Sequence, residues 1–222
     1  MGQRAESTNP YVIDDPVVEE AAFFGREAKL EWAVELLDER GVRHVLIVQG
    51  SYRIGKTSFL RQLQKRLKQT AFVVDLSEAK EDGLGYLLWR TAADVASTVS
   101  LVTGRTFARP ELNDFLSDAD YFQDEFLPTL FKVLRRSRLL LAFDGLESLE
   151  GGDGSARQGF YAYLATLMDY DTGLSLLLAV EEWPREAQET FREAYRLKLD
   201  PLDTGAATSL IVEPSSGVLD FD

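Results

Sequence analysis

The chain has 222 residues, of which 45% are apolar and 27% charged, so it can form one α/β domain with a full core. It has no cysteine and one histidine, which excludes a disulfide framework and disfavours thiolate or histidine metal sites, and its net charge of −13 argues against direct binding of DNA or RNA. No stretch approaches about 18 apolar residues and no signal-peptide pattern is present, so we expect a cytoplasmic protein that does not interact with membranes.

The N-terminal part predicts an extended segment, a helix and a strand. We expect residues 1–22 to be extended, because two prolines in this segment disfavour helix. Apolar side chains at helical spacing predict a helix over residues 26–39. The mostly β-branched run 44–49 predicts a buried strand. It begins at His44, for which we expect a structural or solvated role.

Strands and helices alternate through the rest of the chain. We expect strands over residues 71–76, 138–143, 174–180 and 196–199, and helices over 58–68, 85–98, 121–136, 160–170, 185–194 and 204–212. Asp203 is expected to cap the last of these helices. Such alternation predicts a parallel sheet covered by helices on both faces.

The most specific motif lies between strand 44–49 and helix 58–68, and it fits the pattern G-x-x-x-x-G-K-[ST]. Its residues, with the one that follows, are Gly50, Ser51, Tyr52, Arg53, Ile54, Gly55, Lys56, Thr57 and Ser58. A glycine-rich turn before a helix directs backbone N–H groups at phosphates, Lys56 reaches the β- and γ-phosphates, and the Thr57 hydroxyl ligates Mg²⁺. The motif therefore predicts a site for a nucleoside triphosphate with Mg²⁺, on a three-layer α/β P-loop NTPase fold with a parallel sheet of about five strands.

The other half of the site is expected where the apolar run 139–143 ends in Asp144, which we assign to the metal. The alternative is a turn or helix-cap aspartate. Many ATPases have glutamate directly after this aspartate, whereas this chain has Gly145. Glu147 is the candidate for activating water, with a solvated loop residue as the alternative. The catalytic assignments are thus Lys56, Asp144 and Glu147.

Two further elements are weaker signals. The strand over 174–180 is expected between the strands that carry the phosphate loop and Asp144, and Glu181 follows it. Because a carboxylate facing a triphosphate would be repelled, a solvated role is favoured for Glu181. Near the N-terminus, Phe24, Gly25 and Arg26 lead into the first predicted helix. The glycine permits another part of the chain to approach its backbone closely. A surface role is the alternative for Arg26.

In this order, the motifs resemble the STAND-type P-loop ATPases, signal-transduction proteins of the ASCE class related to AAA+. The resemblance covers about residues 9 to 215, and it rests on Asn9-Pro10-Tyr11, Phe23 to Glu27, Gly50 to Thr57, Leu139 to Asp144 and the segment from Leu199 to Pro214. It implies a P-loop ATPase domain over residues 23–213. Residues 214–222 would be a C-terminal tail that starts a lid missing from this chain.

The resemblance also implies a function. Phe24, Gly25 and Arg26 would border adenine, which agrees with the absence of the guanine motif Asn-Lys-x-Asp from the chain. The chain would be a slowly hydrolysing Mg-ATP switch of a signalling or defence protein, which joins protein partners or copies of itself through a lid or effector region. The alternative, favoured by Gly145 and the missing lid, is an interaction scaffold that binds ATP or ADP without useful turnover. A small-molecule kinase would need an acceptor pocket and an arginine-rich lid, and the sequence gives no sign of either.

Overall fold

The computed structural model describes residues 16–17, 22–39, 44–79, 83–104, 106–118, 120–136, 138–150, 155–170, 173–183 and 185–214. The extended segment expected over residues 1–22 lies outside the described residues except for Pro16, Val17 and Ala22. The tail expected over 214–222 lies outside them except for Pro214.

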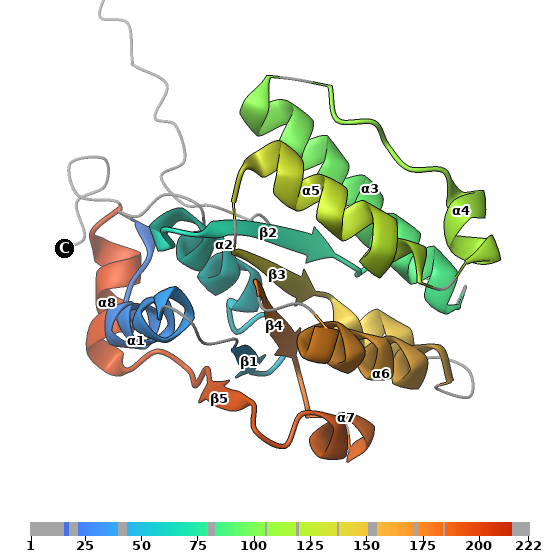
Figure 1. The fold of residues 1–222 in the computed structure, drawn as a ribbon. Coiled ribbons are helices and arrows are strands. Elements are labelled where there is room, and N and C mark those ends of the chain that lie inside the picture. Colours follow the sequence, from blue (N-terminus) through green and yellow to red (C-terminus); the bar gives the residue numbers. More distant parts are fainter. Residues whose placement is uncertain are drawn as a thin grey trace, which may run out of the picture.

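A five-stranded parallel sheet forms the centre of the molecule (Figure 1). The strands are β1 (Val45–Gln49), β2 (Thr70–Asp75), β3 (Leu139–Asp144), β4 (Leu174–Val180) and β5 (Tyr195–Lys198). They lie in the order β2-β3-β4-β1-β5, which confirms the parallel sheet and the position of the fourth strand between those that carry the phosphate loop and Asp144. Because parallel strands end at one edge, the loops after β1, β3 and β4 meet there.

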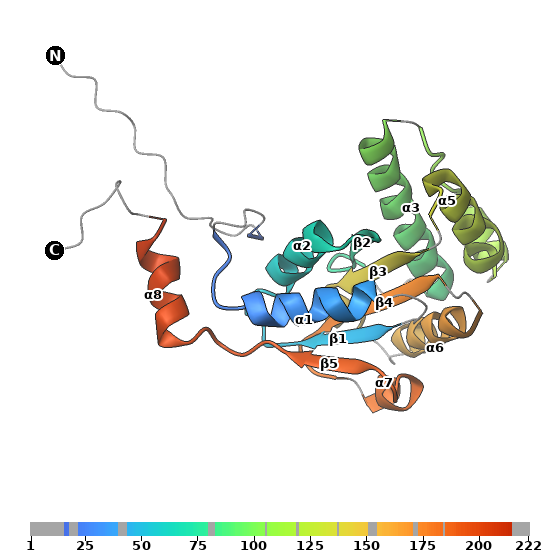
Figure 2. The ribbon, with the colours of Figure 1, turned by 60° about the vertical axis from the view of Figure 1, so that its left-hand side comes forward.

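Helices cover both faces of the sheet, and the strand side chains alternate between them. On one face, Leu46 and Val48 pack with α1 (Glu27–Asp38) and α2 (Lys56–Arg66). On the other face, Ile47 belongs to the core built with α3 (Leu84–Thr103), α5 (Leu127–Leu134), α6 (Ser155–Tyr170) and α7 (Arg185–Thr190). Figure 2 shows these layers from the side. The three-layer α/β fold is therefore as predicted.

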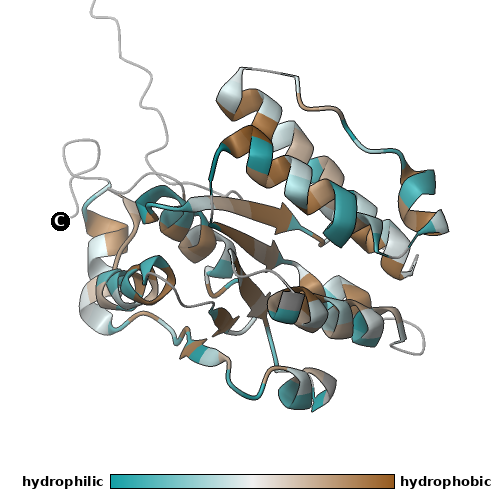
Figure 3. Ribbon diagram, viewed as in Figure 1, coloured by the Kyte–Doolittle hydropathy of each residue, from teal (hydrophilic) through white to brown (hydrophobic). Residues whose placement is uncertain are grey.

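Strands β3 and β4, which are neighbours in the sheet, are buried along their whole length. Every residue of β3 and of β4 is buried, and Figure 3 shows both strands as apolar. A parallel strand covered on both faces has no solvent side, so its sequence is a continuous apolar run instead of an alternating one. The carboxylate of Asp144, at the end of such a run, is thereby held at the sheet edge.

The structure differs from the prediction around residues 121–136, which form a π-helical turn η2 (Phe122–Phe126) followed by α5. The Leu127 N–H donates to the Phe122 carbonyl, five residues earlier. Pro128 follows and has no N–H to donate, so it marks the change of helix type. The short elements α4 (Leu112–Ser117) and η3 (Leu146–Glu150) were not predicted, because they are too short to show a period.

Helix α8 (Thr204–Val212) follows β5 and lies at the end of the molecule away from α3 and α5 (Figure 2). Asp203 caps it as predicted, because its Oδ1 accepts a hydrogen bond from the Ala206 N–H at 2.8 Å. A Cβ at Gly25 would lie 2.4 Å from the Ala206 Cβ, so glycine lets α8 approach the start of α1. None of the described helices combines the length and the apolar character needed to cross a membrane.

Candidate functional site

The phosphate loop, residues 50–57, connects β1 to α2 at the edge where the strands end. The Gly50 N–H donates to the Val180 carbonyl at 3.0 Å, which ties the loop to β4. A Cβ at Gly50 would lie 2.6 Å from the Ile54 Cγ2, and Gly55 has a φ of 95°, a value that side chains rarely adopt. Gly50 is thus required by its close packing against Ile54 and Gly55 by its backbone conformation, and α2 begins directly after Gly55.

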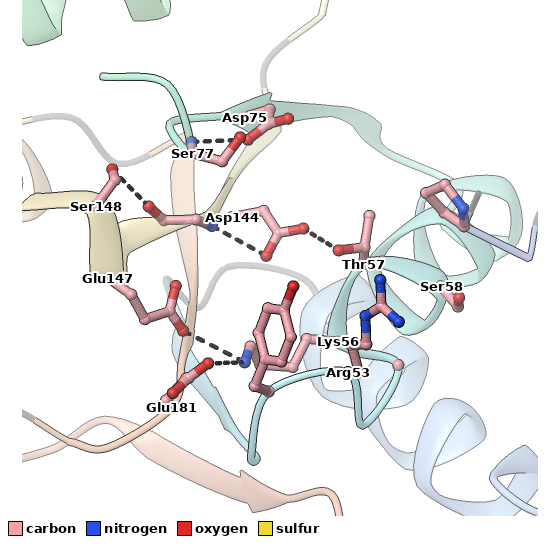
Figure 4. A pocket seen from close by; sticks show the side chains of 14 residues that line it. Arg53, Lys56, Thr57, Ser58, Asp75, Ser77, Asp144, Glu147, Ser148 and Glu181 are labelled. Atoms are coloured by element: carbon pink, nitrogen blue, oxygen red, sulfur yellow. Dashed lines mark hydrogen bonds and ion pairs between the residues drawn. The ribbon is translucent and has the colours of Figure 1, made fainter. Parts of the chain in front are cut away.

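Lys56 points into the site and is 9% exposed. Its Nζ donates to the Gly50 carbonyl at 2.9 Å. The same nitrogen lies 3.3 Å from the Glu147 Oε1 and 3.9 Å from the Glu181 Oε1 (Figure 4). The ammonium group therefore lies between the phosphate loop and two carboxylates that come from other strand ends.

Thr57 and Asp144 are in direct contact, because the Thr57 hydroxyl donates to the Asp144 Oδ2 at 2.5 Å. The Gly145 N–H donates to the other carboxylate oxygen at 3.1 Å. Burial raises the pKa of Asp144, and the two hydrogen bonds oppose that shift. A hydroxyl and a carboxylate side by side are hard oxygen donors of the kind that Mg²⁺ takes together with water and substrate phosphates. The described residues hold no group of three or more His, Cys, Asp or Glu suited to a metal.

The chain turns back toward Lys56 directly after Asp144. Gly145 has a φ of 71°, and a Cβ there would lie 2.5 Å from the backbone nitrogen of Ser77. An acidic side chain at position 145 therefore has no room. The turn continues into η3, whose Ser148 hydroxyl donates to the Leu76 carbonyl at 2.5 Å, and it brings Glu147 to the site. The structure thus explains why glycine replaces the acid that many ATPases carry here.

A cavity of about 630 Å³ lies between these elements. One wall is the phosphate loop and the start of α2, and it contains Tyr52, Arg53, Gly55, Lys56, Thr57 and Ser58. The opposite wall carries Asp75, Asp144, Glu147 and Glu181. Figure 4 shows Lys56 facing Glu147 and Glu181, and Thr57 facing Asp144, from separate elements. The described lining therefore sets two cations, Arg53 and Lys56, against four carboxylates.

Some lining residues were not singled out from the sequence. Asp75 ends β2 directly opposite Asp144 in the strand register, and its Oδ1 accepts a hydrogen bond from the Ser77 N–H at 2.8 Å. Its position at the end of a predicted strand could have indicated that Asp75 lies at the same sheet edge as Asp144. Glu181 was expected to be solvated; its side chain is 38% exposed, but it lines the cavity next to Lys56.

The residues expected near adenine lie at the start of α1. Arg26 is 8% exposed, and its Nη2 donates to the Asp200 carbonyl at 3.2 Å. A Cβ at Gly55 would lie 2.7 Å from the Arg26 Nη1, so the guanidinium packs against the phosphate loop, and burial lowers the pKa of Arg26. Phe24 and Gly25 do not line the described cavity. Arg26 does not line it either. The surface alternative for Arg26 is wrong, whereas an adenine contact by Phe24, Gly25 and Arg26 stays a prediction.

Comparisons with known proteins show similarity in structure and not in sequence. No protein-family model matches the chain, and a search of curated protein sequences finds no match. A Walker-type ATPase of Pyrococcus abyssi is similar with a TM-score of 0.68 and 17% identity over 95% of this chain and 63% of its own.

Two further solved structures are similar as well. The Orc1 protein of Aeropyrum pernix, solved in complex with DNA, matches with a TM-score of 0.54 at 16% identity, over 88% of this chain and 50% of its own. Cdc6p of Pyrobaculum aerophilum matches with a TM-score of 0.52 at 14% identity, over 86% and 49%. This chain thus spans 63% of the first of these proteins and about half of the others. The parallel five-stranded sheet with helices on both faces is therefore a fold that this chain shares with the Walker-type ATPase and the two other structures.

Proposed function

We propose that this chain is a Mg²⁺-ATP-binding, slowly hydrolysing switch module of STAND type. The observation that supports it most is the arrangement of Lys56 and the Thr57–Asp144 pair around one cavity at the start of α2. The phosphate loop supplies backbone N–H groups at the positive end of the helix dipole, where phosphates bind. The likeness to a Walker-type ATPase agrees with this proposal.

Nucleotide binding would begin with an exchange of partners at Lys56. In the structure this cation faces Glu147 and Glu181, and the phosphates of ATP would replace these carboxylates. Thr57 and Asp144 would hold Mg²⁺, which neutralises phosphate charge and polarises the γ-phosphate. With two cations against four carboxylates in the cavity, an uncomplexed tetra-anion would be repelled. Binding should therefore depend strictly on the metal.

Hydrolysis would then use the carboxylate that Lys56 releases. The Glu147 Oε1 is buried and faces the Lys56 ammonium at 3.3 Å. Once the phosphates take that cation, the oxygen has a lone pair for the proton of an attacking water. The side chain reaches the cavity because η3 turns back after Gly145. Turnover should be slow, since no carboxylate directly follows Asp144.

The test is steady-state phosphate release by the purified chain with ATP and Mg²⁺. We expect slow release that Asp144→Asn reduces by at least about tenfold, because the variant removes the charged metal ligand. Asp118→Asn, at an exposed position outside the cavity, is the matched control and should keep the wild-type rate. Phosphate release that is equal in wild type and Asp144→Asn would disprove hydrolysis at this site.

The scaffold that binds nucleotide without turnover is the second candidate. The ion pair between Lys56 and Glu147 favours it, because it occupies both the phosphate-binding cation and the proposed base. A scaffold predicts that ATP with Mg²⁺ raises the melting temperature, since a ligand that binds only the folded state stabilises it. No product would form during the same incubation, which distinguishes the scaffold from the slow ATPase.

We further propose that the partners are proteins or other copies of the chain, without direct nucleic-acid contact. Helix α8 carries Leu210, Ile211 and Val212 as exposed apolar side chains. An exposed apolar surface of this kind suits contact with another protein. DNA is present in the Aeropyrum pernix Orc1 complex, but a net charge of −13 disfavours it here. A fluorescence-anisotropy titration with duplex DNA at low salt should show no binding.

A further inference from the structure

Arg53, in the middle of the phosphate loop, has an unusual backbone conformation. Its φ is 57°, in the left-handed region that glycine adopts readily and other residues rarely adopt. Of the described residues other than glycine, Arg135 alone shares such a φ, and it ends α5, where a left-handed residue is common. Arg53 does not end a helix, and glycine would adopt its φ without strain. The backbone therefore does not account for an arginine at this position.

The Arg53 side chain is exposed, so packing in the hydrophobic core does not account for it either. The residue lines the nucleotide cavity, and Figure 4 shows its guanidinium on the cavity side of the loop, as it shows Lys56 and Thr57. The Arg53 Cζ lies 5.7 Å from the centroid of the Tyr52 ring, which is a cation–π contact. Since Tyr52 is 74% exposed, this pair lies at the rim of the cavity. Strained residues are typical of functional sites, so the arginine is expected to act on a ligand.

The charges of the cavity indicate which ligand group Arg53 suits. Among the described lining residues, Lys56 is the other cation, and its Nζ faces the carboxylates of Glu147 and Glu181 at 3.3 and 3.9 Å. Mg²⁺ cancels only part of the charge of a triphosphate, so a second cation stabilises the bound phosphates. A guanidinium offers planar N–H donors that match the oxygens of a phosphate. Arg53 therefore has both the charge and the donors that a phosphate chain requires.

We propose that Arg53 is a second phosphate-binding cation of this site, whose guanidinium donates hydrogen bonds to the phosphate chain of the bound nucleotide. The inference rests on the proposed function, because it needs a nucleotide in the cavity. The contact with Tyr52 holds the guanidinium beside the loop before the ligand arrives, which reduces the conformational entropy lost on binding. The left-handed backbone costs stability, so stability and affinity oppose each other at this position.

The test separates the phosphate chain from the rest of the nucleotide. Mg-tripolyphosphate has neither base nor ribose, and isothermal titration calorimetry measures its affinity beside that of Mg-ATP. We expect the wild type to bind both, and Arg53→Ala to weaken both about fivefold, the size of a charge-assisted hydrogen bond at an exposed position. Arg53→Lys keeps the charge and should recover most of the lost affinity. Arg136→Ala removes an exposed arginine outside the cavity and should change neither affinity.

Arg53→Gly adds a measurement that separates binding from loop structure. Glycine adopts a φ of 57° without strain, so this variant should melt about 2–4 °C above Arg53→Ala and no lower than the wild type. Its affinity for both ligands should nevertheless be as low as that of Arg53→Ala. An Arg53→Gly variant that melts several degrees below the wild type would overturn the proposal, because the arginine would then stabilise the loop and weaker binding would follow from its loss.

The remaining outcomes distinguish this inference from the proposed function. If the wild type binds neither ligand, or if Lys56→Ala binds both as the wild type does, the proposed nucleotide site fails and the inference fails with it. If binding requires Lys56 but Arg53→Ala leaves both affinities unchanged, only the role of Arg53 is overturned. A wild type that binds Mg-ATP alone, or a loss in Arg53→Ala that is confined to Mg-ATP, would also overturn that role, because the affinity would then come from the base or the ribose.

Discussion

The two walls of the nucleotide cavity differ in how the chain builds them. The phosphate-loop wall is one continuous stretch, residues 50–58, whose backbone is fixed by its own glycines. The acidic wall is assembled from the ends of β2, β3 and β4, and its members are up to 106 positions apart in the sequence, from Asp75 to Glu181. The first wall can be recognised in a sequence as a motif, whereas the second exists only because of the strand order. Under the proposed function, the wall that binds phosphates is therefore encoded by one local motif, whereas the carboxylates that would compete with phosphates are brought together by the strand order.

Lys56→Ala should produce the largest effect, because it removes a buried cation that contacts both walls. We expect the affinity for Mg-ATP to fall at least about 100-fold, or about 2.7 kcal/mol, the size of a hydrogen bond to a charged group in a closed site. Isothermal titration calorimetry measures it. Lys68→Ala removes the same charge at an exposed position just after α2 and should leave the affinity unchanged. Equal affinities for both variants would mean that the phosphate loop is not the binding wall.

Gly145→Ala tests how the acidic wall is held in place, and its effect is on stability. The added Cβ would meet Ser77 backbone atoms at 2.5 and 2.7 Å, and the residue has a positive φ. We expect the free energy of unfolding in urea to fall by about 2 kcal/mol. Gly104→Ala is the control, because its φ is also positive, at 64°, but nothing lies within 4 Å of the added atom. A loss no larger than in the control would show that the contact with Ser77 is not tight.

The same contrast explains how much of the fold was predictable. The run 139–143 is apolar throughout and 174–180 is apolar except for Ser175, so burial on both faces could be inferred from composition, and the motif predicted the phosphate loop. The partial exposure of β5 and the π-helical turn before α5 depend on tertiary context and on Pro128. Within the site, Asp144 was assigned from its place after an apolar run. Asp75 was not, because its role depends on its strand register with Asp144.

Glu147→Gln should change binding and hydrolysis in opposite directions. Without its charge, Lys56 loses a partner at 3.3 Å that phosphates must displace, so we expect Mg-ATP to bind about threefold more tightly. Phosphate release should fall about tenfold, because the amide cannot take a proton from water. Calorimetry and a phosphate-release assay measure the two effects. Glu182→Gln, at an exposed neighbouring position, should change neither, and a Glu147→Gln variant with normal release would rule out Glu147 as the base.

Glu181→Gln should have the smallest effect of the substitutions in the acidic wall. Its carboxylate lies 3.9 Å from the Lys56 Nζ and is 38% exposed, so solvent screens the pair and we expect at most about twofold tighter binding of Mg-ATP. The double variant with Glu147→Gln is more informative. If both carboxylates compete with phosphates for one ammonium, either alone can retain it, and the double variant should gain more affinity than the two single variants added together. Strict additivity in calorimetry would mean that the two glutamates act separately and that the acidic wall is not one unit.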